Sequence, residues 1–331
     1  TALTEHADDA RHSRDLVQIR LDVPVPDEPE AFRYLGPDRE RCFALFSALG
    51  FKSLLNDYAP TAETVVTDYR IVNEVGDLDA LAKTLREAGR FGLHVLTVSG
   101  PPSSDRIVGL SFSSTPRSAC YIPLAGHGLD LSGSLDDRTV FDALRPVLED
   151  SDVRKVGHDL KRELLWLAAC DIELRGLEFD TMLASYLLDA TRTTPTLETV
   201  ALEVIGYQAL TAESVRGKGA KAPGFDQLPP DGVLAFACER ADLPLQGADL
   251  VRAQLDDEKL GTLYRELEHP LVPVLAAIET NGIRVDTDAL AGQSQRMDAE
   301  LADLQTRVFT LAGEEFNINS TQQLGHILFD K

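Results

Sequence analysis

The chain has 331 residues, more than one typical domain, and this length predicts two or three folded units. Its net charge of −22 excludes a protein whose whole surface grips nucleic acid, although a local basic patch stays compatible with that charge. Hydrophobic residues make up 44%, enough for a sizeable core, and no apolar run reaches the roughly 18 residues of a membrane span.

The N-terminal sequence and the cysteines both favour a cytoplasmic protein. No basic stretch followed by an apolar one opens the chain, so a signal peptide is not expected. Natural chains begin with Met, and Thr1 therefore predicts a piece of a longer protein or a processed one. The cysteines form no CxxC pair, which favours reduced thiols over a disulfide or metal site. They are Cys42, Cys120, Cys170 and Cys238.

Residues 1–66 read as the end of one unit followed by a linker. A short charged helix is predicted over residues 11–20, and the prolines at 24 and 26 end it because proline lacks the amide donor. An amphipathic helix is predicted over residues 38–50, stopping near Gly50. Residues 56–66 are polar and contain proline, which predicts a linker.

The pattern changes from residue 67 onward. Helices are predicted where apolar residues recur at intervals of three and four, and strands where short apolar runs occur. Strands followed by alternating helices predict an α/β domain with a mixed sheet. The predicted strands are 69–73, 92–98, 107–113, 119–124 and 153–156, and the predicted helices are 77–88, 138–150, 161–169 and 181–189.

Residues 216–224 (Arg-Gly-Lys-Gly-Ala-Lys-Ala-Pro-Gly) form a flexible, positively charged loop. Two interpretations stay open at this point: a plain surface loop, or a contact to a nucleic-acid backbone.

From about residue 261 the chain is predicted to be mostly helical. An apolar helix covers residues 271–279 and stops at Asn281-Gly282, since glycine permits the left-handed turn at a helix end. A long helix is predicted over residues 286–312, and Ser320 is predicted to cap a last helix that runs to residue 330. The long helix places Leu290, Met297, Leu301, Leu304 and Val308 on one stripe.

Three segments carry a resemblance to a known family. Residues 156–163 (Val-Gly-His-Asp-Leu-Lys-Arg-Glu) and 174–188 closely resemble the 3′–5′ exonuclease domain of the family A bacterial DNA polymerase I, and so do residues 217–219. The resemblance implies a ribonuclease H-like 3′–5′ exonuclease fold, an α/β class with a mixed sheet flanked by helices, followed by an α-helical thumb segment.

The resemblance extends over nearly the whole chain. Residues 12–24 resemble the end of that family's 5′-nuclease domain, residues 268–285 the start of its polymerase domain, and residues 312–331 its thumb. It implies three parts: the end of a 5′-nuclease region with a linker (1–66), an exonuclease-like domain (67–262), and the first thumb helices of a polymerase domain that lacks palm and fingers (263–331).

The motifs of exonuclease chemistry fail in this chain. Two-metal hydrolysis needs several carboxylates that converge on two divalent ions. The resemblance places the first motif, Asp-x-Glu, on Leu96 and Val98, the second motif's Asp on Glu163, and the third motif, Tyr-x-x-x-Asp, on Phe236 and Arg240. One carboxylate of four survives. We therefore expect no catalytic residue and no metal site here, and an inactive domain.

Other roles for the remaining carboxylates are open. Asp159, Glu163, Asp180 and Asp242 could form a shifted one-metal site. The alternative is that Asp159 caps the helix that begins at Leu160, that Asp180 caps the helix at residue 181, and that Glu163 is solvated or salt-bridged.

The cation and the histidines near these positions also have ordinary interpretations. Arg240 could pair with Glu163 in place of a metal ion. His158 and His127 fit surface or core histidines better than ligands, because no other His or Cys lies at metal-ligand spacing.

The thumb-like segment carries the predicted DNA contacts. In the resembled family the thumb helices hold the duplex product across the minor groove, without reading its sequence. Plain helix capping is a second role for the same residues, and the two roles are compatible. The residues are Asn317, Asn319, Ser320, Thr321 and Gln322.

The implied function is that of part of a DNA-directed DNA polymerase I acting in replication and repair. Its partners would be a primer–template duplex and the rest of the polymerase chain, with no membrane, and the protein would be a cytoplasmic, nucleoid-associated bacterial monomer. No cofactor is expected in these residues, and Mg²⁺ is expected for the missing palm. The alternatives are a freestanding nucleic-acid-binding scaffold with an exonuclease fold and a divergent, active 3′–5′ exonuclease.

Overall fold

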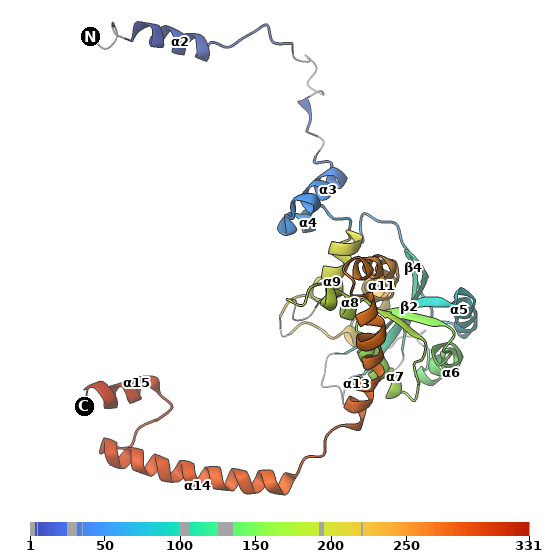
Figure 1. Cartoon of the computed structure of the whole chain (residues 1–331), viewed down its shortest axis with the longest axis vertical. Helices are drawn as coiled ribbons and strands as arrows, with labels where there is room; N and C mark the ends of the chain where they lie inside the picture. The colour runs from blue at the N-terminus through green and yellow to red at the C-terminus, as the bar shows by residue number, and fades with distance from the viewer. Residues whose placement is uncertain are drawn as a thin grey trace.

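A mixed α/β body occupies the centre of the chain (Figure 1). We call residues 68–268 the α/β body. The N-terminal helices lie on one side of it, and the last helices run away from it toward the C-terminus. The computed structural model describes residues 4, 6–24, 32–34, 36–98, 106–124, 135–191, 195–219 and 221–330.

The body is built on a six-stranded sheet in the order β1-β4-β3-β2-β5-β6. The pairs β2–β3 and β3–β4 are antiparallel, whereas β1–β4, β2–β5 and β5–β6 are parallel. The predicted mixed sheet is thus confirmed, with β6 as a strand that was not predicted. The strands are β1 (Asp68–Ile71), β2 (Arg90–Thr97), β3 (Ile107–Thr115), β4 (Ser118–Pro123), β5 (Arg154–Gly157) and β6 (Leu177–Asp180).

Strand β2 separates two apolar cores, because successive side chains of a strand point to opposite faces. Phe91, Leu93 and Val95 lie in the core on one face of the sheet, with α5 (Val75–Ala88) and α6 (Asp137–Leu148). Leu96 packs on the other face with α11 (Pro230–Asp257). The position of the first exonuclease motif therefore faces α11.

The longest helix of the body, α11, crosses the sheet so closely that only glycine fits beneath it. A Cβ at Gly92 would lie 1.9 Å from the carbonyl oxygen of Ala241. This helix was not predicted, because Pro244 and two glycines interrupt its pattern and because it is buried on more than one side. It brings Phe236, Arg240 and Asp242 to the sheet.

Shorter helices complete the body; α7 and α8 agree with the predictions within a few residues, whereas α9, η2, α10 and η3 were not predicted. Helix α7 was predicted at residues 161–169 and α8 at residues 181–189. The elements are α7 (Leu160–Ala168), α8 (Thr181–Leu188), α9 (Leu197–Val200), η2 (Ala201–Ile205), α10 (Ala212–Arg216), η3 (Phe225–Gln227), α12 (Gly261–Leu263) and η4 (Tyr264–Glu268).

Helices α2, α3 and α4 precede the body. Helix α2 (Ala7–Val17) buries none of its residues and ends three residues before the predicted boundary. Helix α3 (Arg39–Leu49) follows the prediction: the Asp38 side chain accepts a hydrogen bond from the Arg41 amide, and Gly50 ends the helix with φ +71°. The predicted linker at 56–66 is wrong at its start, because Lys52–Tyr58 forms helix α4.

The chain leaves the body through α13 (His269–Asn281), which packs on α7 and ends at Gly282 as predicted. The Lys161 ammonium lies 2.5 Å from the Glu279 carboxylate, and the amide of Asp180 donates to the Tyr264 hydroxyl at 2.7 Å. Two further predicted helices follow. They are α14 (Thr287–Ala312) and α15 (Thr321–Gly325), which continues into η5 (His326–Asp330).

Helices α14 and α15 bury none of their residues. Leu290, Met297, Leu301 and Leu304 of the predicted stripe are each more than half exposed. Among the described residues, no helix is both long and apolar enough to cross a membrane.

Candidate functional site

The five positions of the exonuclease motifs come together from β2, α7 and α11, but they form no metal site. Leu96 and Phe236 are almost fully buried in one apolar cluster, and Val98 packs against it. Glu163 and Arg240 line an adjoining cleft of about 240 Å³. Sequence reasoning missed His94, Arg162, Trp166 and Glu198, which line the same cleft.

Glu163, the surviving motif carboxylate, is 1% exposed and lies against β2. Its Oε2 accepts a hydrogen bond from the amide of Val95 at 2.8 Å, and its Oε1 lies 3.0 Å from Nδ1 of His94. The prediction of a solvated or salt-bridged Glu163 is therefore wrong, because the side chain serves as a buried hydrogen-bond partner.

Burial dominates the electrostatics of this pair. It raises the pKa of Glu163 well above its usual range. Burial, assisted by Arg240 and Arg162, lowers the pKa of His94 to about 3. His94 is thus neutral near pH 7, and burial disfavours the charged carboxylate that Glu163 would need to bind a divalent cation.

Arg240 pairs with Glu198, and the pairing with Glu163 suggested by the sequence is wrong. The guanidinium Nη2 lies 2.5 Å from Oε1 of Glu198, and the guanidinium stacks 3.7 Å from the centroid of the Phe236 ring. Burial is the largest effect on the pKa of Glu198 and raises it, but the charge of Arg240 and hydrogen bonds from Arg240, Thr196 and the backbone together lower that pKa. A fixed cation therefore lies where the third motif would supply a carboxylate.

Asp180 caps two helices at once. As predicted, it caps α8, accepting from the amides of Met182 at 2.9 Å and Leu183 at 3.3 Å. It also accepts from the amides of Asp159 at 3.1 Å and Leu160 at 2.7 Å, at the start of α7. These four donors occupy the carboxylate.

The predicted cap by Asp159 is wrong for that reason. Asp159 stands at the N-cap position of α7 with φ +69°, but its side chain makes no capping hydrogen bond. Its carboxylate lies 3.8 Å from Nε of Arg162. Burial, followed by the nearby charge of Asp180, raises the pKa of Asp159 to about 6.

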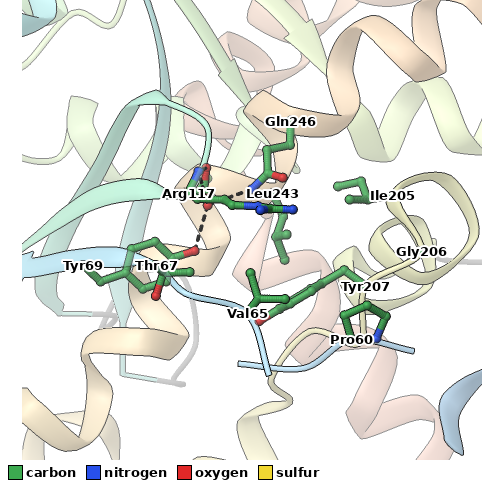
Figure 2. A pocket seen from close by; sticks show the side chains of 11 residues that line it. Pro60, Val65, Thr67, Tyr69, Arg117, Ile205, Gly206, Tyr207, Leu243 and Gln246 are labelled. Carbon is green, nitrogen blue, oxygen red and sulfur yellow. Dashed lines mark hydrogen bonds between the residues drawn. The ribbon is translucent and has the colours of Figure 1, made fainter. Parts of the chain in front are cut away.

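Asp242 lies at a different place, beside a small pocket of about 80 Å³ (Figure 2). It is fully buried and accepts from the Tyr69 hydroxyl at 2.8 Å, the Gln246 amide group at 2.8 Å, the Ser113 hydroxyl at 3.2 Å and the Arg117 backbone amide at 3.0 Å. Figure 2 shows Tyr69, Arg117 and Gln246 around this pocket. Asp242 therefore ties β1, β3 and the β3–β4 turn to α11.

The contacts in the described part of the chain do not favour the shifted one-metal site. The carboxylates of Asp180, Glu163 and Asp242 are each occupied by protein donors. In that part of the chain, no group of three or more His, Cys, Asp or Glu side chains could hold a metal ion.

The histidines and cysteines that were not predicted to bind a metal agree with that prediction where the structure describes them. His158 is a core histidine, with Nδ1 2.9 Å from the Thr181 hydroxyl and Nε2 3.1 Å from the Pro195 carbonyl oxygen. His127 lies outside the described residues. The four cysteines are free thiols.

The predicted DNA contacts lie around the start of α15, where capping occupies part of the cluster. The Ser320 hydroxyl accepts from the Gln323 amide at 3.4 Å, as predicted for a cap, and Asn317 Oδ1 accepts from the Asn319 amide at 3.1 Å. Thr321 and Gln322 are exposed, and the described contacts give their side chains no hydrogen-bond partner. The contact of these residues with DNA stays a prediction.

The chain has clear relatives in sequence. Residues 134–236 match the family described as DNA polymerase I, ribonuclease H-like domain. DNA polymerase I of Pseudomonas aeruginosa is 35% identical over 344 residues, covering 99% of this chain and 38% of that protein. DNA polymerase I of Bacillus subtilis is 29% identical over 332 residues, covering 99% of this chain and 36% of that protein. The chain thus spans less than two fifths of these relatives.

Two solved structures share the fold. The POL domain of Pol1 from M. smegmatis, in complex with a DNA primer-template and dNTP, has a TM-score of 0.59 and 23% identity; the match covers 79% of this chain and 40% of that chain. Brucella melitensis NrnC has a TM-score of 0.50 and 16% identity, with 65% of this chain and 94% of that chain covered. At these identities the likeness concerns the fold alone.

Proposed function

We propose, on the premise that the chain belongs to the DNA polymerase I family, that it is part of a DNA-directed DNA polymerase whose exonuclease-like body no longer hydrolyses DNA. The loss of hydrolysis is inferred from the Arg240–Glu198 ion pair. The Arg240 guanidinium lies 2.5 Å from the Glu198 carboxylate and stands where the third motif would supply a metal ligand. Like charges repel, so this cation opposes a divalent ion in the same space.

The proposed division of the chain is the one expected from the sequence. Residues 1–66 would belong to the end of a 5′-nuclease region and a linker, residues 67–262 to the exonuclease-like domain, and residues 263–331 to the thumb. The palm, with the Mg²⁺ that it would hold for nucleotide addition, lies outside this chain. Whole-protein activity in replication and repair, as a cytoplasmic monomer, is part of the proposal.

An inactive body retains a mechanical role in this proposal. Helix α13, at the start of the thumb segment, is attached to the body at two separated points, the Tyr264–Asp180 hydrogen bond before its first turn and the Lys161–Glu279 ion pair near its end. Val272 and Ala276 are buried between these points. Two attachments with a buried seam fix the direction in which the chain leaves the body, and the body would thereby orient the thumb.

The thumb would hold duplex DNA through the exposed residues around the start of α15. Of the five predicted residues, Asn317 and Ser320 use side-chain oxygens locally, so Thr321 and Gln322 are the best placed to reach a phosphate. A contact of this kind positions DNA without reading its sequence.

A binding measurement on the 331-residue chain tests this function. The variant Thr321→Ala/Gln322→Ala should raise the Kd for a fluorescent primer–template duplex roughly tenfold, because two hydrogen bonds to phosphate each contribute about 0.5–1.5 kcal/mol. Gln293→Ala/Ser294→Ala, on exposed positions of α14, is the matched control and should leave Kd unchanged. Equal Kd values for the two variants would contradict the proposal that Thr321 and Gln322 bind duplex DNA.

A further inference from the structure

Residues 216–224, called the lysine loop below, lie beside the remains of the exonuclease site. Residue 220 is outside the described part of the chain. A Cβ at Gly224 would lie 3.7 Å from Cγ1 of Val98, so the loop returns to the body next to a motif position. At its other end the loop leaves α10 at Arg216.

The base of the lysine loop is fixed by its own arginine. Nε of Arg216 donates to the carbonyl oxygen of Pro223 at 2.6 Å, which closes the loop. The Arg216 guanidinium also lies 5.1 Å from the centroid of the Phe225 ring. Arg216 thus holds the loop in place and has little freedom to bind a partner.

The same base is connected to the replaced motif residues. The Phe225 ring stacks on Phe236 with centroids 4.8 Å apart, and Arg240 covers Phe236 at 3.7 Å. Arg216, Phe225, Phe236 and Arg240 therefore form one continuous stack from the loop to the cleft. The two residues that break the third motif now support the loop, so the loss of the metal site and the placement of the loop are physically linked.

The exposed part of the loop presents positive charge and open backbone. Lys218 and Lys221 are exposed, and within the described residues neither makes an ion pair. No acidic residue occurs between Glu213 and Asp226, although the chain as a whole carries a charge of −22. Asp226 itself lies 3.1 Å from the Arg106 guanidinium, which reduces its effect on the two lysines.

Two glycines keep the loop backbone accessible. Gly217 and Gly219 have φ of +84° and +96°, which glycine adopts without strain, and no atom lies within 4 Å of a Cβ built on either. The Ala222 amide donates to the Gly219 carbonyl oxygen at 3.1 Å and shapes the turn between the lysines. Paired lysines on a braced, open turn are suited to a polyanion that approaches along its backbone.

We propose that the lysine loop binds the phosphodiester backbone of DNA through Lys218 and Lys221, without a metal ion, with Phe236 and Arg240 as positioning residues. This inference deepens the proposed function, on which it rests, by giving the inactive body a direct DNA contact. Single-stranded and duplex DNA share this chemistry, so both serve as probes.

The test compares two charge-matched double variants of the 331-residue chain. Lys218→Gln/Lys221→Gln removes the two loop cations, and Lys83→Gln/Lys259→Gln removes two exposed cations elsewhere. Kd is measured by fluorescence anisotropy with EDTA present, for labelled oligo(dT) and for a labelled blunt duplex, over a range of salt concentrations. The fluorescence of Trp166, the single tryptophan, confirms that both variants stay folded.

For the loop variant we expect Kd for oligo(dT) to rise roughly tenfold at about 50 mM salt. The slope of log Kd against log salt should fall by about 1.4, since each phosphate contact to a single strand contributes about 0.7. A loss confined to the duplex would also support the loop as a backbone contact and would identify duplex DNA as its ligand. An unchanged Kd for both probes, or an equal loss in the control variant, would overturn it.

Failure of this inference is distinguishable from failure of the proposed function, because the two rest on different residues. A chain whose duplex affinity depends on Thr321 and Gln322 but not on Lys218 and Lys221 keeps the thumb role and loses the loop contact.

Discussion

Replacing Asp242 with alanine is expected to lower the free energy of unfolding of the α/β body by about 4 kcal/mol. Asp242 is fully buried and accepts hydrogen bonds from Tyr69, Ser113, Gln246 and the Arg117 amide. Alanine leaves these donors without their protein acceptor. A residue held for a metal ion would behave oppositely, since removing an unpaired carboxylate relieves repulsion.

Urea unfolding followed by Trp166 fluorescence measures this loss, because Trp166 lies in α7 within the body. Asp257→Ala, an exposed carboxylate on the same helix α11, is the matched control and should change stability by less than about 0.5 kcal/mol. Asp242→Asn keeps one acceptor oxygen, and its loss of stability should lie between those of Asp242→Ala and Asp257→Ala. An Asp242→Ala variant as stable as the control would show that the four hydrogen bonds contribute nothing.

Restoring a motif carboxylate by Leu96→Asp should also destabilise the body by about 4 kcal/mol, and divalent cations should not recover the loss. Leu96 is 3% exposed and packs with Phe225 and Phe236. Aspartate there loses this packing and places a charged group in an apolar cluster. The nearby Arg240 is already paired with Glu198, and Glu163 is hydrogen-bonded to Val95, so no ligand set awaits the new carboxylate.

The measurement is the urea midpoint of Leu96→Asp with EDTA, with Mg²⁺ and with Mn²⁺. Leu96→Asn controls for the lost packing without adding charge, and its midpoint should lie between those of the wild type and Leu96→Asp. A midpoint of Leu96→Asp that rises in Mn²⁺, while that of Leu96→Asn does not, would reveal a metal site that the geometry denies.

Much of the fold follows from local patterns. The caps by Asp38, Asp286 and Ser320 were predictable because each acts on amides two or three residues away. The strand at 92–98 was predictable from its apolar run, and its two faces indeed belong to two different cores. Helix α11 was not predictable from the sequence, because burial on several sides removes the amphipathic periodicity that indicates a helix.

In the candidate site, too, some features were predictable from the sequence and others were not. The residue types at positions 96, 98, 236 and 240 were enough to predict that the metal ligands are lost, whereas the new partners were not predictable. Glu198 lies 42 residues from Arg240 in sequence, and Asp180 lies 20 residues from the Leu160 amide that it caps. Such contacts depend on how α7, α9 and α11 meet, and no periodicity in the sequence encodes that meeting.

The experiment to make first incubates 5′-labelled single-stranded DNA with the pure chain, in Mg²⁺ and then in Mn²⁺. The variant Glu163→Gln, purified identically, controls for contaminating nuclease and keeps an acceptor for the Val95 amide. We predict that the labelled strand keeps its full length in both metals and with both proteins. A ladder of products shortened from the 3′ end, present with the wild-type chain and absent with Glu163→Gln, would contradict the loss of the metal site.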